Sequence, residues 1–318
     1  MKRFLTAAAV LFLTLSRLEA MGMGREADFD IGEFHSLHLA VPCTMTLVRG
    51  ASFGMDIEDR NNRIDQLEIY NDQGTLVFKQ KEKNLLRLIK KDDIHITLTM
   101  PVWKSIHVSS SADLRSREYW ENDDISLKAS ASGDISLGDI QAGSAEIRVS
   151  GSGDIITGRL DLNGPLELTA SSSGNIEADG VSCASVKVKN SASGEIDLGD
   201  IQAPEGSLQV KSSGSGDSSF GLVQVRNAVL NTLSSGEIRA EIISDSMEVK
   251  SSGSGDISLT GRTGLASVKT SGSGSVNAQN MDIDEAVAAG SGSGDIILAP
   301  GTRIRESRFS GSGQLIIR

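Results

Sequence analysis

Aromatic residues are scarce in this sequence of 318 residues: they make up 4% of it, with two tryptophans and two tyrosines. A folded core must therefore be built mainly from small and β-branched side chains. Proline is also rare, with 5 residues against 34 glycines. This imbalance excludes a collagen triple helix, which needs both residues in a strict three-residue period. After residue 25 no segment keeps a 3.6-residue apolar period for three turns, which argues against long amphipathic helices.

Positive charge and long apolar runs are both in short supply. The formal net charge is -11 at pH 7, so nucleic acid is not predicted as a partner, because a phosphate backbone requires a basic surface. The same deficit disfavours adsorption to anionic lipid. Beyond Ala20 no apolar stretch is long enough to cross a bilayer, and we expect no membrane span once the segment up to Ala20 is removed.

Residues 1–20 have the composition of an export signal. Lys2 and Arg3 precede an apolar run from Phe4 to Leu15, and small residues follow up to Ala20, where we expect cleavage. An uncleaved membrane anchor is the alternative. We therefore predict a protein exported to the periplasm, the outer-membrane surface or the extracellular space.

Cysteine is limited to Cys43 and Cys183, which lie far apart in the chain. In an oxidising compartment two such residues can pair. A disulfide, however, needs Cα atoms within about 7 Å of each other, and the intervening chain covers several of the repeats described next. Two separate thiols are therefore expected.

A recurring glycine is the strongest signal in the chain. The ten copies are Gly133, Gly153, Gly174, Gly194, Gly216, Gly236, Gly255, Gly274, Gly294 and Gly313. Their nearly constant spacing, about 20 residues, lies in the range that is typical of stacked repeat architectures. Serine precedes this glycine in every copy, and the residue before that serine is alanine, glycine or serine. We expect short side chains to stack at a corner, with the glycine in a backbone conformation that other residues avoid.

Apolar residues alternate with polar ones on both sides of this serine corner. Ile135 and Leu137 follow the first glycine at the second and fourth positions, and later copies repeat the pattern. A similar alternation precedes the serines, and the period of two is typical of strands with one buried face. A third short face is expected near Ile140, Leu160, Val181, Ile201 and Val223. Because one rung cannot bury its own apolar side, the rungs must stack, about 4.8 Å apart.

The predicted fold is all-β: a parallel β-helix, or β-solenoid, with rungs of about 20 residues over 125–318. Residues 21–124 lack the regular glycine, and we expect them to form irregular opening rungs that cap the solenoid and continue into it. A separate small β-domain is the alternative. The strands expected there are Ser36–Ala40, Thr44–Val48, Gly54–Glu58, Leu67–Asn71, Thr75–Gln80 and Ile94–Thr99, followed by a degenerate rung at 109–114.

Several short stretches carry a family resemblance. Ser130–Ile135, Ser150–Ile155 and Ser252–Ile257 share the form Ser-x-Ser-Gly-Asp-Ile, and the opening runs are Phe34–Gly50 and Ile94–Pro101. Together these stretches resemble the putative auto-transporter adhesin, head GIN domain family of bacterial envelope proteins, over roughly residues 30–318. The resemblance implies a parallel β-helix in the cell envelope, and it implies little about activity.

The position after the repeat glycine forms an acidic column. Seven of its ten residues are carboxylates: Asp134, Asp154, Glu195, Asp217, Glu237, Asp256 and Asp295. Like charges about 4.8 Å apart repel each other, which would favour a divalent cation such as calcium. The other interpretation is a turn residue that accepts backbone hydrogen bonds and faces water. We predict the second, and therefore neither a metal nor a cofactor.

Five positions before the glycine the column is basic. Its seven charged members are Lys128, Arg148, Lys189, Lys211, Lys250, Lys269 and Arg308. Two positions earlier, on the same outward side, stand Glu146, Glu167, Glu248 and Glu306. Cross-strand ion pairs on a solvated face explain both sets. The functional alternative, a surface for an anionic glycan, is weakened because the glutamates cancel part of the field.

No catalytic residues are indicated. The four histidines, at positions 35, 38, 95 and 107, precede the regular rungs, and Gly151-Ser-Gly is a corner repeat rather than a nucleophile elbow. Uniformly repeated carboxylates suit a scaffold better than a single active centre. We predict an exported, non-enzymatic scaffold or adhesin-like binding protein, with an envelope glycan or a surface protein as the candidate partner. The alternative is a carbohydrate-active β-helix enzyme, such as a polysaccharide lyase or hydrolase.

Overall fold

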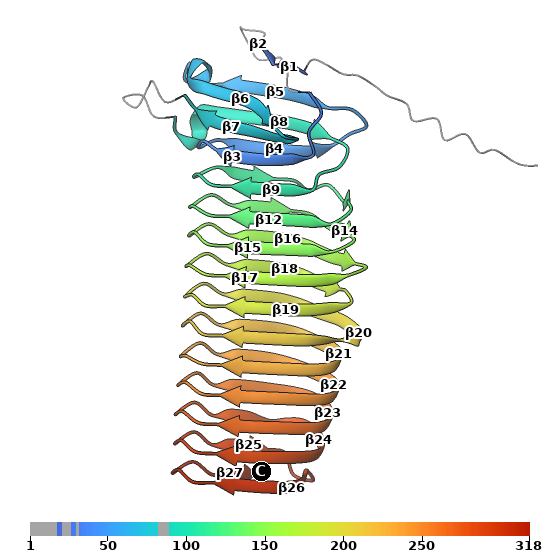
Figure 1. Cartoon of the computed structure of the whole chain (residues 1–318), viewed down its shortest axis with the longest axis vertical. Coiled ribbons are helices and arrows are strands. Elements are labelled where there is room, and N and C mark those ends of the chain that lie inside the picture. Colours follow the sequence, from blue (N-terminus) through green and yellow to red (C-terminus); the bar gives the residue numbers. More distant parts are fainter. Residues whose placement is uncertain (1–17, 21–26, 30–31, 82–88) are drawn as a thin grey trace, which may run out of the picture.

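The repeating apolar columns and corner glycines wind the chain into a β-solenoid of about 11 turns, with parallel strands about 20 residues apart (Figure 1). Only 2% of the structure is helical, so the predicted all-β solenoid is confirmed. The computed structural model describes residues 18–20, 27–29, 32–81 and 89–318. The predicted export segment 1–20 lies outside the described residues except for Leu18–Ala20.

The first part of the chain, up to residue 124, combines rungs with antiparallel strands. Its elements are β1 (Leu18–Ala20), β2 (Ala27–Phe29), β3 (Ser36–Ala40), β4 (Thr44–Arg49), β5 (Gly54–Asp59), η1 (Ile64–Gln66), β6 (Leu67–Asp72), β7 (Thr75–Gln80), η3 (Lys91–Asp93), β8 (Ile94–Met100), β9 (Ser105–Val108), β10 (Asp113–Arg115) and β11 (Trp120–Glu121). The six strands expected there are all present, with ends that agree within one residue. β1–β2, β5–β8 and β6–β7 are antiparallel, whereas β4 pairs in parallel with β8 and β10.

The regular rungs follow from residue 125. Their strands are β12 (Ile125–Ala129), β13 (Ile135–Leu137), β14 (Ile140–Ala142), β15 (Ala145–Val149), β16 (Ile155–Leu162), β17 (Pro165–Ala170), β18 (Ile176–Ser182), β19 (Ser185–Asn190), β20 (Ile196–Ser212), β21 (Ser218–Thr232), β22 (Ile238–Ser251), β23 (Ile257–Thr270), β24 (Val276–Gly290), β25 (Ile296–Leu298), β26 (Arg303–Phe309) and β27 (Leu315–Ile317). From β20 to β24 one long strand runs from each serine corner to the next. The corners form the row of narrow loops at the left of Figure 1.

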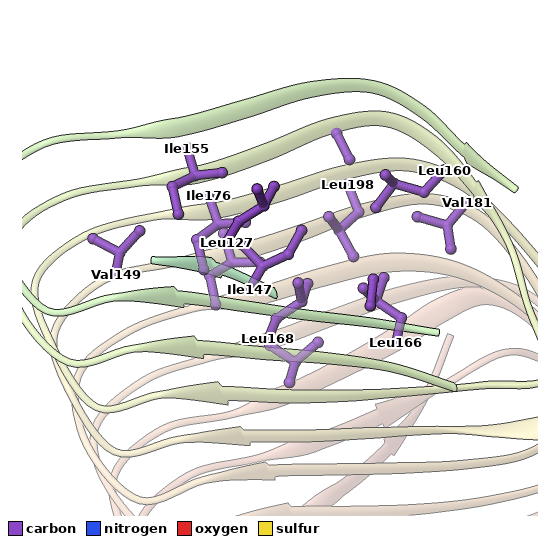
Figure 2. Packing of buried hydrophobic residues seen from close by; sticks show 14 of the residues in the cluster. Leu127, Ile147, Val149, Ile155, Leu160, Leu166, Leu168, Ile176, Val181 and Leu198 are labelled. Carbon is purple, nitrogen blue, oxygen red and sulfur yellow. The ribbon is translucent and has the colours of Figure 1, made fainter. Parts of the chain in front are cut away.

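Apolar side chains stack in register inside the solenoid. Ile155 pairs with Ile176, and Ile176 with Ile196, so one residue type fills one column through successive rungs. Ile140 pairs with Leu160, which confirms the short third face. All five side chains are at most 1% exposed, and Figure 2 shows such columns packed against each other. Burying one aliphatic side chain of this size contributes about 1.5–3 kcal/mol, so the stacked columns dominate stability.

The repeat glycines are required by close stacking and not by an unusual backbone angle. The described glycines with positive φ are Gly32, Gly74, Gly261 and Gly301, none of which belongs to the repeat, so the expected conformational reason is wrong. A Cβ atom on Gly255 would instead lie 2.1 Å from the carbonyl oxygen of Gly236 in the preceding rung. Other repeat glycines meet the same obstacle, which explains why the column tolerates no side chain.

A second column at the corner is polar although it points into the core. Its members are Asn190, Ser212, Thr232, Ser251 and Thr270, each no more than 2% exposed. Ser251 Oγ donates to the carbonyl oxygen of Gly255 at 3.1 Å, and Thr232 Oγ1 donates to that of Gly236 at 3.2 Å. A buried hydroxyl without a partner is costly, so these bonds let Thr232 and Ser251 stay polar while they secure the corner backbone. Ser212 Oγ, in the same column, has no hydrogen-bond partner among the described residues.

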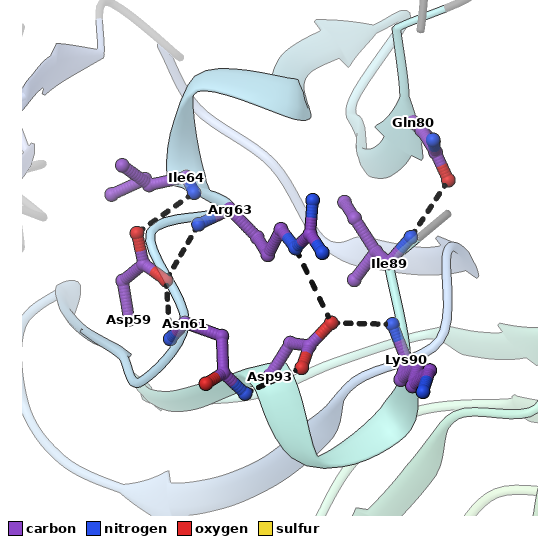
Figure 3. A network of polar contacts seen from close by, with 8 residues as sticks. All are labelled: Asp59, Asn61, Arg63, Ile64, Gln80, Ile89, Lys90 and Asp93. Carbon is purple, nitrogen blue, oxygen red and sulfur yellow. Dashed lines mark hydrogen bonds and ion pairs between the residues drawn. The ribbon is translucent and has the colours of Figure 1, made fainter. Parts of the chain in front are cut away.

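The opening section is held by larger side chains and a polar network. Trp103 and Trp120 pack edge to face, 6.2 Å between ring centroids, at the junction with the regular rungs. Beside η1, Asp59 accepts the backbone N–H groups of Arg63 and Ile64 at 2.8 and 2.9 Å (Figure 3). These contacts stabilise the first rungs, which lack the repeat glycine of the rungs that follow.

Both cysteines are buried free thiols, as expected from their separation. Burial raises the pKa of the Cys43 thiol to about 12, and the nearby charge of Asp113 adds to the effect. Burial likewise raises the pKa of Cys183 to about 11. Neither side chain has the thiolate character that nucleophilic or redox chemistry needs.

Candidate functional site

The basic column runs in register along the whole regular solenoid. In rung order it consists of Lys128, Arg148, Thr169, Lys189, Lys211, Asn231, Lys250, Lys269, Ala289 and Arg308. Two basic residues are followed by one neutral residue, three times in succession, before the column ends in arginine. Pairs of positive charges therefore recur every third rung, which is roughly 14 Å along the solenoid axis.

The glutamates beside this column pair with only some of its members. Within-strand ion pairs join Glu146 to Arg148, Glu248 to Lys250 and Glu306 to Arg308. Among the described residues, the one cross-strand pair of these glutamates joins Glu167 to Lys187, which lies two positions before the column member Lys189, at 3.5 Å. The expected cross-strand pairing is therefore mostly wrong, because residues two apart project from the same side of a strand and reach each other first.

Four lysines of the basic column are left without a carboxylate partner. Throughout the described residues, no carboxylate lies within ion-pair distance of Lys128, Lys189, Lys211 or Lys269, and all four side chains are exposed. Lys189 and Lys211 are direct neighbours on β19 and β20. Charges held this way are available to a ligand, and their placement is fixed by the register of the rungs.

The acidic column has a different role in the structure. Asp134 Oδ1 accepts the backbone N–H of Asp154 at 2.9 Å, and Asp154 Oδ1 accepts that of Asn175 at 2.7 Å. Further along the column, Asp217 and Asp256 accept N–H groups of Glu237 and Ser275 in the same way, each at 2.7 Å. The side chains thus bond one rung to the next at the turn. That the column binds no metal stays a prediction.

Several carboxylates act on Glu177. Burial raises the pKa of Glu177, and the negative charges of Asp154, Asp197 and Glu195 raise it further. Among the described residues, no group of three or more His, Cys, Asp or Glu side chains is arranged to hold a metal ion. The raised pKa of Glu177 therefore reflects the negative charge that gathers on the strands that follow the serine corner.

Two of the four histidines contact the serine corner, which the sequence did not indicate. His38 and His107 stack with 4.5 Å between centroids and 5° between planes, because β3 and β9 pair in register. His38 Nε2 lies 2.7 Å from Ser109 Oγ, and His107 Nε2 lies 2.8 Å from Ser130 Oγ. Burial lowers the pKa of both rings, and the charges of His38 and Lys128 add to this for His107. The pair continues the basic column into the opening section.

A shallow groove lies at the edge opposite the serine corner. It has a volume of about 480 Å³ and is lined by Pro204, Gln224, Val225, Ile243, Ser244, Asp245, Arg262, Gly264 and Asp284. Arg262 lies 3.6 Å from a carboxylate oxygen of Asp282 and of Asp284. Two carboxylates therefore already neutralise the one cation in this groove.

The described part of the chain has no helix with the length and apolar character needed to cross a membrane.

Comparison with known proteins identifies a family. The family model for the putative auto-transporter adhesin, head GIN domain matches residues 33–221 and 218–318. No curated protein matches the chain.

Solved structures of bacterial proteins resemble the chain at low identity. A putative adhesin from Parabacteroides distasonis is 15% identical with a TM-score of 0.42, over 91% of this chain and 94% of its own. A putative adhesin from Parabacteroides merdae is 14% identical with a TM-score of 0.36, over 91% and 93%. A putative lipid binding protein from Parabacteroides distasonis is 17% identical with a TM-score of 0.32, over 91% and 94%. The family match covers nearly the whole described solenoid, and the chain belongs to the putative auto-transporter adhesin, head GIN domain family.

Proposed function

We propose that the protein is an exported, non-catalytic, adhesin-like binding protein of the bacterial envelope, which holds an extended partner along a long repeated face. The observation that carries the proposal is the unbroken register of outward side chains. Lys128 pairs with Arg148, and the column continues through eight further strand pairs to Arg308. A partner with its own repeat then meets basic side chains on most rungs, in one line, and gains from multivalency.

Membership of the putative auto-transporter adhesin, head GIN domain family supports this role. The candidate partners are an envelope glycan or a surface protein. The aspartates of the acidic column accept backbone N–H groups, as Asp154 does from Asn175, and this engagement leaves them poorly placed for acid–base chemistry.

One observation favours a second candidate, a carbohydrate-active enzyme. Asp245 and Asp284 both line the groove of about 480 Å³, and paired carboxylates are the usual groups of glycoside hydrolysis. The test is release of reducing sugar from a panel of envelope polysaccharides by the wild type and by the Asp245→Asn/Asp284→Asn variant. Release that the variant loses would establish the enzyme and refute the binding role as the main one.

The binding role is tested with the full chain, expressed with its export segment so that the host processes it. The purified protein is labelled and incubated with whole bacterial cells and with cells stripped of surface polysaccharide. We expect saturable binding that the unlabelled protein displaces. Absence of saturable binding to any cell preparation would contradict the proposed function.

A further inference from the structure

The two long sheets of the solenoid carry opposite charge. The first sheet consists of the five positions that follow each repeat glycine, from β13 to β25. Its outward side chains include one basic residue, Arg239, and eleven acidic residues. These are Asp134, Asp154, Glu177, Asp179, Glu195, Asp197, Asp217, Glu237, Glu241, Asp256 and Asp295. The net charge of -11 of the whole chain is thus concentrated on this sheet.

The sheet that precedes the serine corner has the reverse balance. From β12 to β23 its outward side chains include seven basic and three acidic residues. The basic residues are Lys128, Arg148, Lys187, Lys189, Lys211, Lys250 and Lys269, and the acidic residues are Glu146, Glu167 and Glu248. The acidic ones are all engaged in ion pairs, and among the described residues four of the lysines have no carboxylate within ion-pair distance. A protein that is acidic overall therefore presents one basic face.

We propose that this basic face binds a linear anionic polysaccharide laid parallel to the solenoid axis, with Lys128, Lys189, Lys211 and Lys269 as its main contacts. This inference rests on the proposed binding role and names the ligand class. The free lysines lie in one column, a single residue wide, so they follow a line rather than a plane. A linear polyanion matches that shape, whereas a membrane surface would require a broad basic patch with apolar side chains to insert.

Charge carries the recognition, because the face has no rings on which sugars stack. None of the outward residues of β12, β15, β17 and β19 is aromatic, and the neutral members of the column are threonine, asparagine and alanine. Thr169 and Asn231 interrupt the lysines at every third rung, roughly 14 Å apart. A linear polysaccharide that carries carboxylates along its whole length places acid groups opposite each of the free lysines, whatever the spacing between them.

The acidic sheet does not prevent such binding. The two sheets of a solenoid lie about 10 Å apart, and the Debye length at physiological ionic strength is about 8 Å. Repulsion from the far sheet is therefore largely screened at the basic face, while it still opposes binding on the acidic side. The charge difference then selects which face the polymer contacts.

The test measures binding of the full chain to immobilised polygalacturonate, a linear polysaccharide with carboxylates, with neutral dextran as the reference polymer. The test variant combines Lys128→Gln, Lys189→Gln, Lys211→Gln and Lys269→Gln. The matched control combines Arg159→Gln, Arg226→Gln, Arg239→Gln and Arg262→Gln, which removes the same charge from the other surfaces. Circular dichroism and melting temperature confirm that both variants fold.

We expect the wild type to bind polygalacturonate and not dextran, with an affinity that falls steeply as salt rises. The lysine variant should lose roughly tenfold or more in affinity and show a shallower salt dependence, because fewer counterions are released. The arginine control should change less than about twofold, since its residues lie off the basic face. No binding by the wild type, or equal losses in both variants, would overturn the proposal. Whole-cell binding retained by the lysine variant would also overturn it while leaving the binding function itself intact.

Discussion

The acidic and basic columns look alike in the sequence, yet the structure uses them differently. Asp154 accepts a backbone N–H from the next rung, so its charge helps to hold two rungs together. Lys189 is exposed with no carboxylate in ion-pair distance in the described structure, so its charge is free. Columns of repeated charge in a solenoid therefore divide into those that stabilise the stack and those that face a partner. Hydrogen-bond partners, more than charge or spacing, distinguish the two.

The largest expected effect comes from breaking the corner that joins both sheets. In Gly255→Ala the added methyl carbon would lie 2.1 Å from the Gly236 carbonyl oxygen, so neighbouring rungs must separate. We expect a loss of on the order of 3 kcal/mol in the free energy of unfolding, measured by chemical denaturation. The control Ser254→Ala removes only an exposed hydroxyl at the adjacent position and should change little. Equal stability of the two variants would show that the corner can open without cost.

The next largest effect separates the two columns directly. Asp154→Ala leaves the N–H of Asn175 without its acceptor, and we expect a loss of about 1–2 kcal/mol in unfolding free energy. Lys189→Ala should change stability by no more than about 0.5 kcal/mol. Asp154→Asn is the sharper control, because Asn175 itself accepts the N–H of Glu195 at 2.8 Å, and so most of the stability should return. A loss for lysine that matches the loss for aspartate would remove the distinction between the columns.

Acidic pH should lower the folding stability of the opening section, where His38 and His107 stack. Burial lowers the pKa of His38 and His107 in the folded protein, below the value of about 6.5 that unfolded histidine has. The folded state therefore binds fewer protons, so the stability is present above about pH 6.5 and is lost as the pH falls through the lowered folded values. We expect the melting temperature of the wild type to fall more between neutral and acidic pH than that of His38→Gln/His107→Gln. Parallel pH profiles would contradict a contribution from this stacked pair.

The smallest expected effect concerns metal at the acidic column. Because carboxylates such as Asp134 and Asp256 are already bonded to the backbone, a chelator should leave the melting temperature nearly unchanged. A decrease of more than about 5 °C on chelation would reveal a bound ion that stabilises the fold.

The recurring glycine and the period of two predicted the solenoid, its rung length and the strands of the opening section. They did so because equivalent positions of stacked rungs lie in the same environment, and each therefore needs a side chain of similar size and polarity. The reason for the glycine was missed, since the approach of Gly255 to Gly236 involves two rungs and leaves no sign in the local backbone preference.

Contacts between different columns were also beyond the sequence pattern. The interior polar residues, such as Thr232 and Ser251, stand where apolar side chains are expected, and only the nearby glycine carbonyls explain them. His38 and His107 lie far apart in the chain, and their stacking depends on the register of β3 with β9. The sequence does show the basic column and its regular interruption. Which of its lysines lack a carboxylate partner follows only from the ion pairs in the structure.

Deletion of single rungs tests most directly whether binding is spread along the repeated face. Removing residues 237–255 takes out one rung with Lys250 and lets equivalent strands meet, so the register of the remaining rungs is kept. We predict a folded protein whose binding to whole cells weakens only a few-fold, because the other rungs still contribute. Deletion of any other regular rung should behave alike. A single deletion that folds normally and yet abolishes all binding would contradict the distributed face and place the function in one discrete site.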